Sequence, residues 1–259
     1  MRHLAITVEQ QPSGDVDGWF NVSPITLGPD GLPSMACVAM LVDALGGVRS
    51  ITAADPDWAF TADLTLHLVP CPPMSELMAK LRVRRRGRRT LVIEAELLGD
   101  RKNPYGFGTL TFAVVDRPAQ VKDVEITIQP GIRSLSSLPA DEPPSRNYIE
   151  ELPFTIEAPG VLVCDLQPEI ANTAGALHGA VHTAAFDEAG KSLARALWGV
   201  DGFTTDCHLA FLDLALQSPL RVVSEIMGEP SEQKLVTRAE LRDANGKLCS
   251  YATTTVMRV

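Results

Sequence analysis

The sequence predicts an α+β protein made of two similar units in tandem, each with one long helix covering a curved antiparallel sheet. Three observations predict this fold class. The same order of elements, a strand, a long helix and four further strands, occurs twice along the 259 residues. A helix that carries one aspartate, followed by a strand that opens with Phe-Thr-x-Asp, also occurs twice. A proline-rich segment separates the two copies.

Composition narrows the classes of function. Hydrophobic residues make up 45% of the chain and charged residues 21%, which is typical of a globular protein. The net charge of −9 argues against nucleic acid and anionic membrane as partners. We expect no membrane span, because no apolar run reaches about 20 residues, and no signal peptide, which favours a cytoplasmic location. The five cysteines are widely spaced and odd in number, so we expect reduced thiols and no structural zinc site.

The first unit is expected to span residues 1–116. A strand over 18–22 precedes an apolar helix over 33–45, with Pro33 at the first helical position and Gly46-Gly47 at its end. Alternating runs then predict four strands, over 59–69, 76–85, 89–98 and 105–115.

A linker is expected over residues 117–151, because prolines recur from Pro118 to Pro159 with little periodicity between them. Residues 124–128 are predicted to form a short strand within it. The second unit, 152–259, repeats the order of the first: a strand over 161–166, a helix over 178–197, and strands over 203–212, 220–228, 234–242 and 247–258. Asp243-Ala244-Asn245-Gly246 predicts a tight turn between the last two strands.

The two units can be aligned residue by residue. Residues 59–63 match residues 202–206, and Asp43 lies 18 positions before Thr61 as Asp187 lies 17 before Thr204. An internal duplication explains both the matched spacing and the matched order of elements. We expect the sheets of the two units to join, because joining removes exposed edges.

The most informative segment holds Asn172, then His178-Gly179, then Asp187, and is followed by the Thr204 strand. This pattern closely resembles the PaaI-like group of hot-dog thioesterases, although Ala180 replaces the second glycine of the usual His-Gly-Gly. The resemblance covers 152–259 well and 15–116 more faintly. It implies two tandem hot-dog domains and an acyl-CoA thioesterase that releases a free acid and coenzyme A. It implies no metal and no cofactor beyond the coenzyme A of the substrate. A homodimer of double hot-dogs is compatible with it.

The residue types suit thioester hydrolysis on physical grounds. A glycine at a helix N-terminus, here Gly179, exposes a backbone N–H that can stabilise negative charge on the carbonyl oxygen. An aspartate in an apolar helix can attack the carbonyl directly or deprotonate water. Asn172 can hold that water or the carboxylate, and a threonine at the strand start can hydrogen-bond the same groups.

The resemblance also implies that the site is composite, with Asn and His-Gly from one unit and the carboxylate and threonine from the other. In the first unit Gly28, Ser34 and Met35 stand where the second has Asn172, His178 and Gly179. One complete set therefore remains: Asn172, His178 and Gly179 with Asp43 and Thr61. The opposite set, Asp187 and Thr204, is expected to be inactive or much weaker. The alternative places the working carboxylate at Asp187, in the same unit as His178-Gly179.

Simpler interpretations compete with several of these assignments. Asp43 and Asp187 could each be a polar residue at the edge of an amphipathic helix, although their repeated spacing argues against it. His178 and His182 have the i, i+4 spacing of a metal pair, but no third ligand is evident. Cys37 is expected to be a packed core residue, because no base is adjacent.

The arginine run from Arg82 to Arg89 surrounds Gly87 in a predicted hairpin. It could protect an edge strand, or its members Arg85, Arg86 and Arg88 could bind the phosphates of coenzyme A. The alternative to an enzyme is a hot-dog protein that binds an acyl thioester, or supports assembly, without turnover. A hot-dog hydratase is less favoured, because Arg101 precedes Asn103-Pro104 where an aspartate would be expected.

Overall fold

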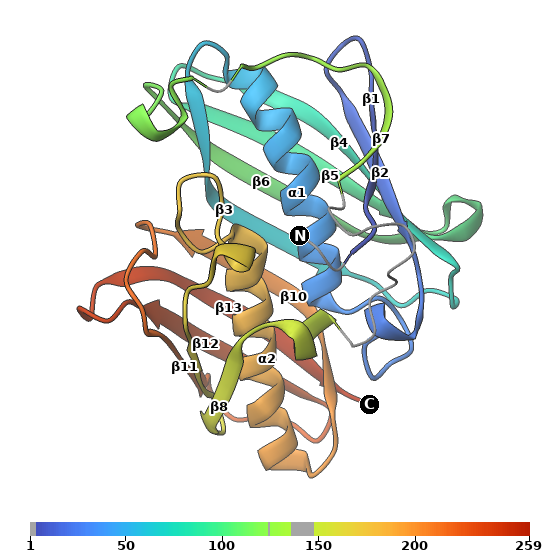
Figure 1. Cartoon of the computed structure of the whole chain (residues 1–259). Helices are drawn as coiled ribbons and strands as arrows, with labels where there is room; N and C mark the ends of the chain where they lie inside the picture. The colour runs from blue at the N-terminus through green and yellow to red at the C-terminus, as the bar shows by residue number, and fades with distance from the viewer. Residues whose placement is uncertain (1–3, 124, 136–147) are drawn as a thin grey trace.

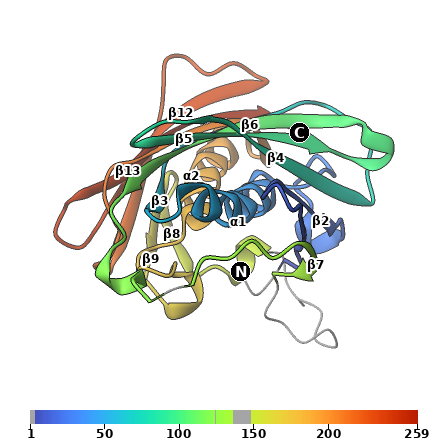
Figure 2. The same cartoon turned by 90° about the horizontal axis from the view of Figure 1, so that it is seen from above.

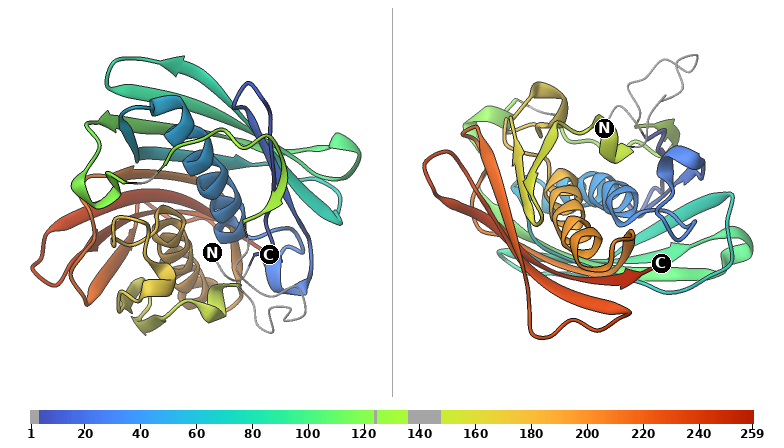
Figure 3. Two further views of the ribbon diagram at one scale, coloured as in Figure 1. Left: turned by 45° about the horizontal axis from the view of Figure 1, so that its top comes forward. Right: turned by 90° about the horizontal axis from the view of Figure 1, so that it is seen from below.

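Thirteen antiparallel strands form one continuous sheet that curves around two long helices, α1 (Met35–Ala54) and α2 (Gly179–Trp198) (Figure 1). The computed structural model describes residues 4–123, 125–135 and 148–259. The strand order is β7-β1-β2-β4-β5-β6-β3-β10-β13-β12-β11-β9-β8. Figures 2 and 3 show the helices side by side within the curve of the sheet. The expected pair of helix-and-sheet units is therefore present, and their sheets are joined.

The first half supplies six strands: β1 (Thr7–Gln10), β2 (Val16–Asn21), β3 (Trp58–Leu68), β4 (Glu76–Arg86), β5 (Thr90–Leu98) and β6 (Pro104–Val115). The four long strands agree with the predicted runs to within one residue at each end. Alternation explains this agreement, since every second side chain of β5 faces the helix side and is buried. The four-residue strand β1 was not predicted.

The first helix is longer than predicted, because Gly46-Gly47 does not end it. A Cβ at Gly46 would lie 2.8 Å from Leu110 Cδ2, so this glycine lets the helix approach β6 closely. Pro33 is not the first helical residue either; it precedes Ser34, the N-cap, whose Oγ accepts from the Cys37 N–H at 3.4 Å. Contrary to the prediction of no membrane span, the helix is by length and composition long and apolar enough to span a membrane. About two thirds of it is buried inside the protein, as befits a core helix.

The second half supplies β8 (Phe154–Ala158), β9 (Val161–Cys164), β10 (Gly202–Phe211), β11 (Leu220–Ile226), β12 (Lys234–Arg242) and β13 (Leu248–Arg258). The last four lie where strands were predicted, and β8 was not predicted. The predicted turn forms through Asp243, whose Oδ1 accepts from the N–H groups of Asn245 and Lys247. Gly246 completes it with a positive φ of 78°.

Part of the predicted linker belongs to the sheet. β7 (Gly131–Ser134) pairs with β1 and forms one end of the strand order. The strand predicted over 124–128 is not found: residue 124 lies outside the described residues, and residues 125–128 form no strand. Short 3-10 helices occur at η1 (Pro24–Thr26), η2 (Asp100–Lys102), η3 (Ala119–Val121), η4 (Tyr148–Glu151) and η5 (Pro168–Ile170).

The halves are joined by β3 and β10, which pair antiparallel at the centre of the sheet. On the helix side, Leu64 faces Leu209 across the strands, and both are fully buried. On the outer side, His67 Nδ1 lies 2.7 Å from Asp206 Oδ1, and His208 Nε2 lies 2.6 Å from Asp63 Oδ2. Each pair joins an aspartate of one half to a histidine of the other. Both histidines are partly exposed on this side.

Candidate active site

The loop before α2 is shaped by Asn172. Its side-chain Oδ1 accepts hydrogen bonds from the N–H groups of Ala174, at 2.9 Å, and Ala176, at 3.1 Å. Gly175 takes a positive φ of 77° at the tip of the loop. The loop ends at His178, the N-cap of α2, so Gly179 is the first helical residue. Asn172 lines the cavity described below, and among the described residues its side chain makes no hydrogen bond to the Asp43 carboxylate.

The first half has a loop of the same backbone shape with different side chains. Gly28 donates to Leu32 O at 2.7 Å, as Asn172 donates to Ala176 O at 2.7 Å. Ser34, like His178, donates its N–H at 2.9 Å to a carbonyl eight residues earlier. The duplication has thus kept the loop geometry while losing the Asn, His and Gly side chains.

Asp43 of α1 meets the first turn of α2. Its Oδ2 accepts from the Ala180 N–H at 3.0 Å, and its Oδ1 accepts from Thr61 Oγ1 at 3.3 Å. A Cβ on Gly179 would lie 2.7 Å from Asp43 Oδ2, so only glycine permits this approach. The carboxylate is buried, and the positive end of the α2 dipole favours its charge.

The Gly179 N–H is available for a ligand. It has no hydrogen-bond partner among residues 4–123, 125–135 and 148–259, because the helix begins at this residue. The sequence predicts that this N–H is exposed; the hydrogen bond from the next N–H, on Ala180, to the carboxylate was not predicted.

His178 lies against the same carboxylate. Its Nδ1 is 3.2 Å from Asp43 Oδ2 and 3.3 Å from the Ala180 nitrogen, so it donates to the first in one tautomer and accepts from the second in the other. Burial lowers the pKa of His178, although the Asp43 charge opposes the shift. A neutral imidazole that positions the carboxylate is therefore the form expected near neutral pH.

A cavity of about 580 Å³ opens beside these groups and is lined by both halves. Asp43, Thr61, Asn172, His178 and Gly179 all contribute to its wall. Its remaining lining is mostly apolar and includes Ala44, Gly47, Val48, Ile51, Trp58, Phe60, Phe112, Leu177, Phe211, Leu212 and Leu214. The loop 211–215 and the aromatic side chains were not identified from the sequence.

Asp187 occupies a different, smaller pocket of about 190 Å³. Its Oδ1 accepts from Thr204 Oγ1 at 2.5 Å, and its Oδ2 pairs with Lys191 Nζ at 2.9 Å. Ser34 and Met35 line this pocket where the larger cavity has His178 and Gly179. The structure thus places Asp43, and not Asp187, beside His178-Gly179.

The arginine run forms the exposed tip of the β4–β5 hairpin. Arg82 pairs with Asp17 at 2.6 Å, Arg84 pairs with Glu94, and Arg86 donates to Ala53 O at 3.1 Å near the end of α1. In the part of the chain that the structure describes, Arg85 and Arg88 form no ion pair, and both are exposed. None of these arginines lines the cavity, although Thr90, directly after the hairpin turn, pairs with Ala113, which does.

The remaining candidate groups have structural partners. His182 is buried, and its Nδ1 lies 2.8 Å from Ser250 Oγ. No cluster of three or more His, Cys, Asp or Glu side chains suited to a metal occurs among the described residues. Cys37 is fully buried, and burial raises the pKa of its thiol to about 12, consistent with a packed core residue.

Solved structures resemble this chain along nearly its whole length. An acyl-ACP thioesterase from Bacteroides thetaiotaomicron matches with a TM-score of 0.62 and 12% identity, covering 93% of this chain and 96% of the other. The tesB protein of Mycobacterium avium subs paratuberculosis gives a TM-score of 0.62 and 12% identity, over 94% and 92%. A protein of unknown function with a hot dog fold from Alicyclobacillus acidocaldarius gives 0.57 and 14%, over 94% and 93%.

No protein-family model matches the chain, and no curated protein sequence matches it. The PaaI-like relationship therefore stays a prediction. Identities this low establish the fold alone, and they agree with the topology described above. The chain has the double hot-dog fold, with two helices wrapped by one joined antiparallel sheet.

Proposed function

We propose that this protein is a thioesterase that hydrolyses acyl-CoA at one composite site between its two halves. The observation that carries the proposal is the 3.0 Å contact between Asp43 Oδ2 of α1 and the Ala180 N–H of α2. It places a buried carboxylate of one half against the free Gly179 N–H of the other, beside a cavity able to hold a ligand. The structural neighbours described as thioesterases support thioester chemistry in general.

In the proposed reaction, Asp43 takes a proton from a water molecule whose oxygen attacks the carbonyl carbon of the thioester. The Gly179 N–H donates to the resulting oxyanion, a contribution typically worth about 3–4 kcal/mol. The intermediate then collapses, the C–S bond breaks, and the thiolate of coenzyme A takes the proton from Asp43. A carboxylic acid and free coenzyme A are released. Thr61 and His178 keep the carboxylate oriented.

Direct attack by Asp43 would instead form a mixed anhydride, which water would then open. A single turnover in heavy-oxygen water detects the anhydride route in which water attacks the aspartyl carbon. The general-base route leaves the label in the product acid only, whereas hydrolysis of an anhydride through attack at the aspartyl carbon transfers it to Asp43.

The tip of the β4–β5 hairpin is the proposed contact for the phosphates of coenzyme A. Arg85 and Arg88 are the members of the predicted trio that remain exposed and unpaired among the described residues, whereas Arg86 is held by the end of α1. Guanidinium groups suit phosphate because they donate in a fork.

The second candidate is an acyl-CoA-binding protein without turnover. The observation that favours it is that both oxygens of Asp43 are already hydrogen-bonded, so a water must displace or share a partner before it can be deprotonated. Both candidates use the same cavity.

The test follows thiol release from a panel of acyl-CoA thioesters by wild type, Asp43→Asn and Asp187→Asn. We expect Asp43→Asn to lower kcat by about 10²–10⁴-fold, the usual range for loss of a general base. Asp187→Asn, combined with Lys191→Met so that no lysine is left unpaired, should keep near wild-type turnover per folded molecule. Loss of activity in the Asp187 variant alone would overturn the pairing across the halves. Binding of coenzyme A thioesters without any hydrolysis would favour the second candidate.

A further inference from the structure

The two helices carry residues of opposite chemistry at matched positions. Asp43 and Asp187 correspond, and so do the residues one, four, five and eight positions further along each helix. On α2 these are Glu188, Lys191, Ser192 and Arg195. On α1 they are Ala44, Gly47, Val48 and Ile51, all of which line the large cavity.

On α2 the charged side chains pair with one another beside the carboxylate, and Lys191 lines the smaller pocket. Lys191 Nζ lies 2.9 Å from Asp187 and 3.8 Å from Glu188, and Arg195 pairs with both Glu188 and Asp201. The pocket at this helix measures about 190 Å³, against about 580 Å³ at α1. The small and apolar residues of α1 thus coincide with the roomier of two otherwise similar sites.

Gly47 is the residue for which packing gives no explanation. A glycine inside a helix costs roughly 0.5–1 kcal/mol relative to alanine. At Gly46 the glycine has a packing reason, because a Cβ there would lie only 2.8 Å from Leu110 Cδ2. A Cβ at Gly47 would have no atom within 4 Å, and the residue lines the cavity. The missing side chain therefore leaves room in the cavity and serves no contact within the protein.

The cavity wall near Gly47 is mostly apolar, and the hydroxyl of Ser50, which also lines it, donates to Gly47 O at 3.1 Å. Val48 and Ile51 lie on the same helix, and Trp58, Phe60 and Phe112 come from β3 and β6. Among the described residues, the carboxylates in the lining are Asp43, at the proposed reaction centre, and Asp213, on the loop that also contributes Phe211 and Leu212. None of the described lysines or arginines lines it. A second carboxylate on an acyl group would thus find no cation here to offset its burial.

We infer that the acyl group of the substrate is uncharged and apolar, that it lies along α1 beyond Asp43, and that Gly47 sets the largest group the enzyme accepts. This inference rests on the proposed function, since it assigns the acyl part of the same thioester. A side chain at position 47 would occupy the space of the distal part of a long acyl group. It would leave the reaction centre, four residues earlier on the helix, in place.

The test compares wild type, Gly47→Ala and Gly47→Leu on acetyl-, butyryl-, octanoyl-, lauroyl- and succinyl-CoA. For the longest acyl group that wild type accepts, Gly47→Leu should lower kcat/KM by about tenfold or more. For the shortest acyl group, the same variant should change kcat/KM by no more than about twofold. Gly47→Ala should fall between. Succinyl-CoA should be a poor substrate for all three. Thr52→Leu adds similar bulk to α1 outside the cavity lining and should leave the preference unchanged.

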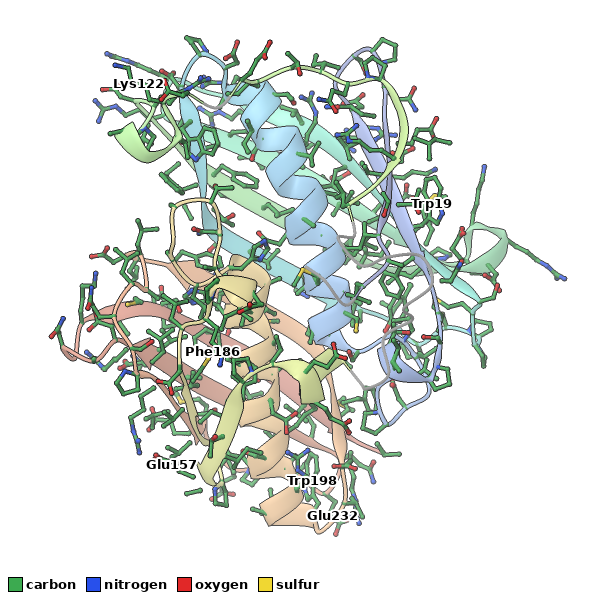
Figure 4. The ribbon with its side chains drawn as sticks, in the orientation of Figure 1. Trp19, Lys122, Glu157, Phe186, Trp198 and Glu232 are labelled. Atoms are coloured by element: carbon green, nitrogen blue, oxygen red, sulfur yellow. The ribbon has the colours of Figure 1, made fainter. Side chains whose placement is uncertain are left out.

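A binding measurement separates this inference from the proposed function. Trp58 lines the cavity, whereas Trp19 and Trp198 do not. Trp19 lies on β2 and Trp198 at the end of α2 (Figure 4). In a Trp19→Phe, Trp198→Phe background, the fluorescence of Trp58 should respond to S-alkyl-CoA thioethers, which cannot be hydrolysed. The response to a dodecyl thioether should weaken in Gly47→Leu, and the response to an ethyl thioether should not.

The outcomes are distinct. If wild type hydrolyses no thioester but the dodecyl thioether binds and Gly47→Leu weakens it, the proposed hydrolysis fails and the assignment of the acyl site stands. If wild type hydrolyses thioesters and Gly47→Leu affects all acyl groups equally, or none, the role of Gly47 is overturned and the proposed function stands. Absence of both hydrolysis and binding overturns both.

Discussion

The two pockets of this protein have similar backbone conformations and differ in a few side chains. Each has a loop of matching hydrogen bonds, a helix that begins after it, an aspartate on the opposite helix and a threonine that donates to that aspartate. At one pocket the helix begins with Gly179 and the carboxylate faces backbone N–H groups. At the other it begins with Met35, and the carboxylate is neutralised by Lys191. The shared backbone geometry is therefore not sufficient for a ligand site; small residues beside the carboxylate are also needed to leave room for the ligand.

The largest expected effect tests how the second pocket is held. Lys191→Met leaves the fully buried Asp187 without its cation, which typically costs about 3–5 kcal/mol of stability. Replacing both partners, with Asp187→Asn and Lys191→Met together, should recover most of that loss. Urea unfolding of wild type and both variants measures it. Equal destabilisation of the single and double variants would mean that the ion pair is not what the pocket depends on.

A smaller effect tests the glycine that distinguishes the first pocket. Gly179→Ala places a Cβ 2.7 Å from the present position of Asp43 Oδ2 and must push the carboxylate away. A displacement near 1 Å commonly costs about 100-fold in rate, so kcat should fall by that order with little change in Tm. The matched control is Met35→Ala, at the corresponding position of α1, which should leave kcat unchanged. Unaltered kcat in Gly179→Ala would contradict the proposed role of this helix start.

The last comparison concerns pH. Burial lowers the pKa of His182 to about 3 from 6.5, so the unfolded chain binds more protons than the folded one between these values. The free energy of unfolding should therefore decrease as pH falls through this window, by up to about 1.4 kcal/mol per pH unit from this group.

The corresponding residue of α1 is Val38, so His182→Val makes the two helices alike at this position. Thermal melts across pH should show a shallower acid limb for the variant. At neutral pH the variant should be less stable, by about 1–3 kcal/mol, because Ser250 Oγ loses its partner. Parallel acid limbs in wild type and variant would show that His182 does not titrate in this way.

The long elements of the fold could be predicted from sequence, because alternation and apolar helical runs report directly on burial. Element boundaries that depend on tertiary contacts could not be predicted from the sequence. Gly46-Gly47 suggested a helix end, yet Gly46 is explained only by the distant Leu110 of β6. The strands β1 and β7 are four residues each and depend on pairing with one another across more than a hundred positions.

For the candidate site, the sequence supplied the residues and the resemblance supplied their pairing across the halves. The structure adds contacts that no spacing encodes, such as the Ala180 N–H to Asp43. The Asp187–Lys191 pair did have a signal, since i and i+4 residues share a helix face, and it was overlooked. The aromatic lining of the cavity comes from strands, where alternation marks a residue as inward without distinguishing a core from a cavity wall.

The joining of β3 to β10 within one polypeptide has a consequence for how the proposed enzyme behaves on dilution. A site shared between two separate chains exists only while they are associated, so its abundance falls steeply below their dissociation constant. Here the two contributors are tethered, and each meets the other at an effective concentration that does not depend on how much protein is present. Specific activity should thus stay constant to very low protein concentration, with one turnover site per chain.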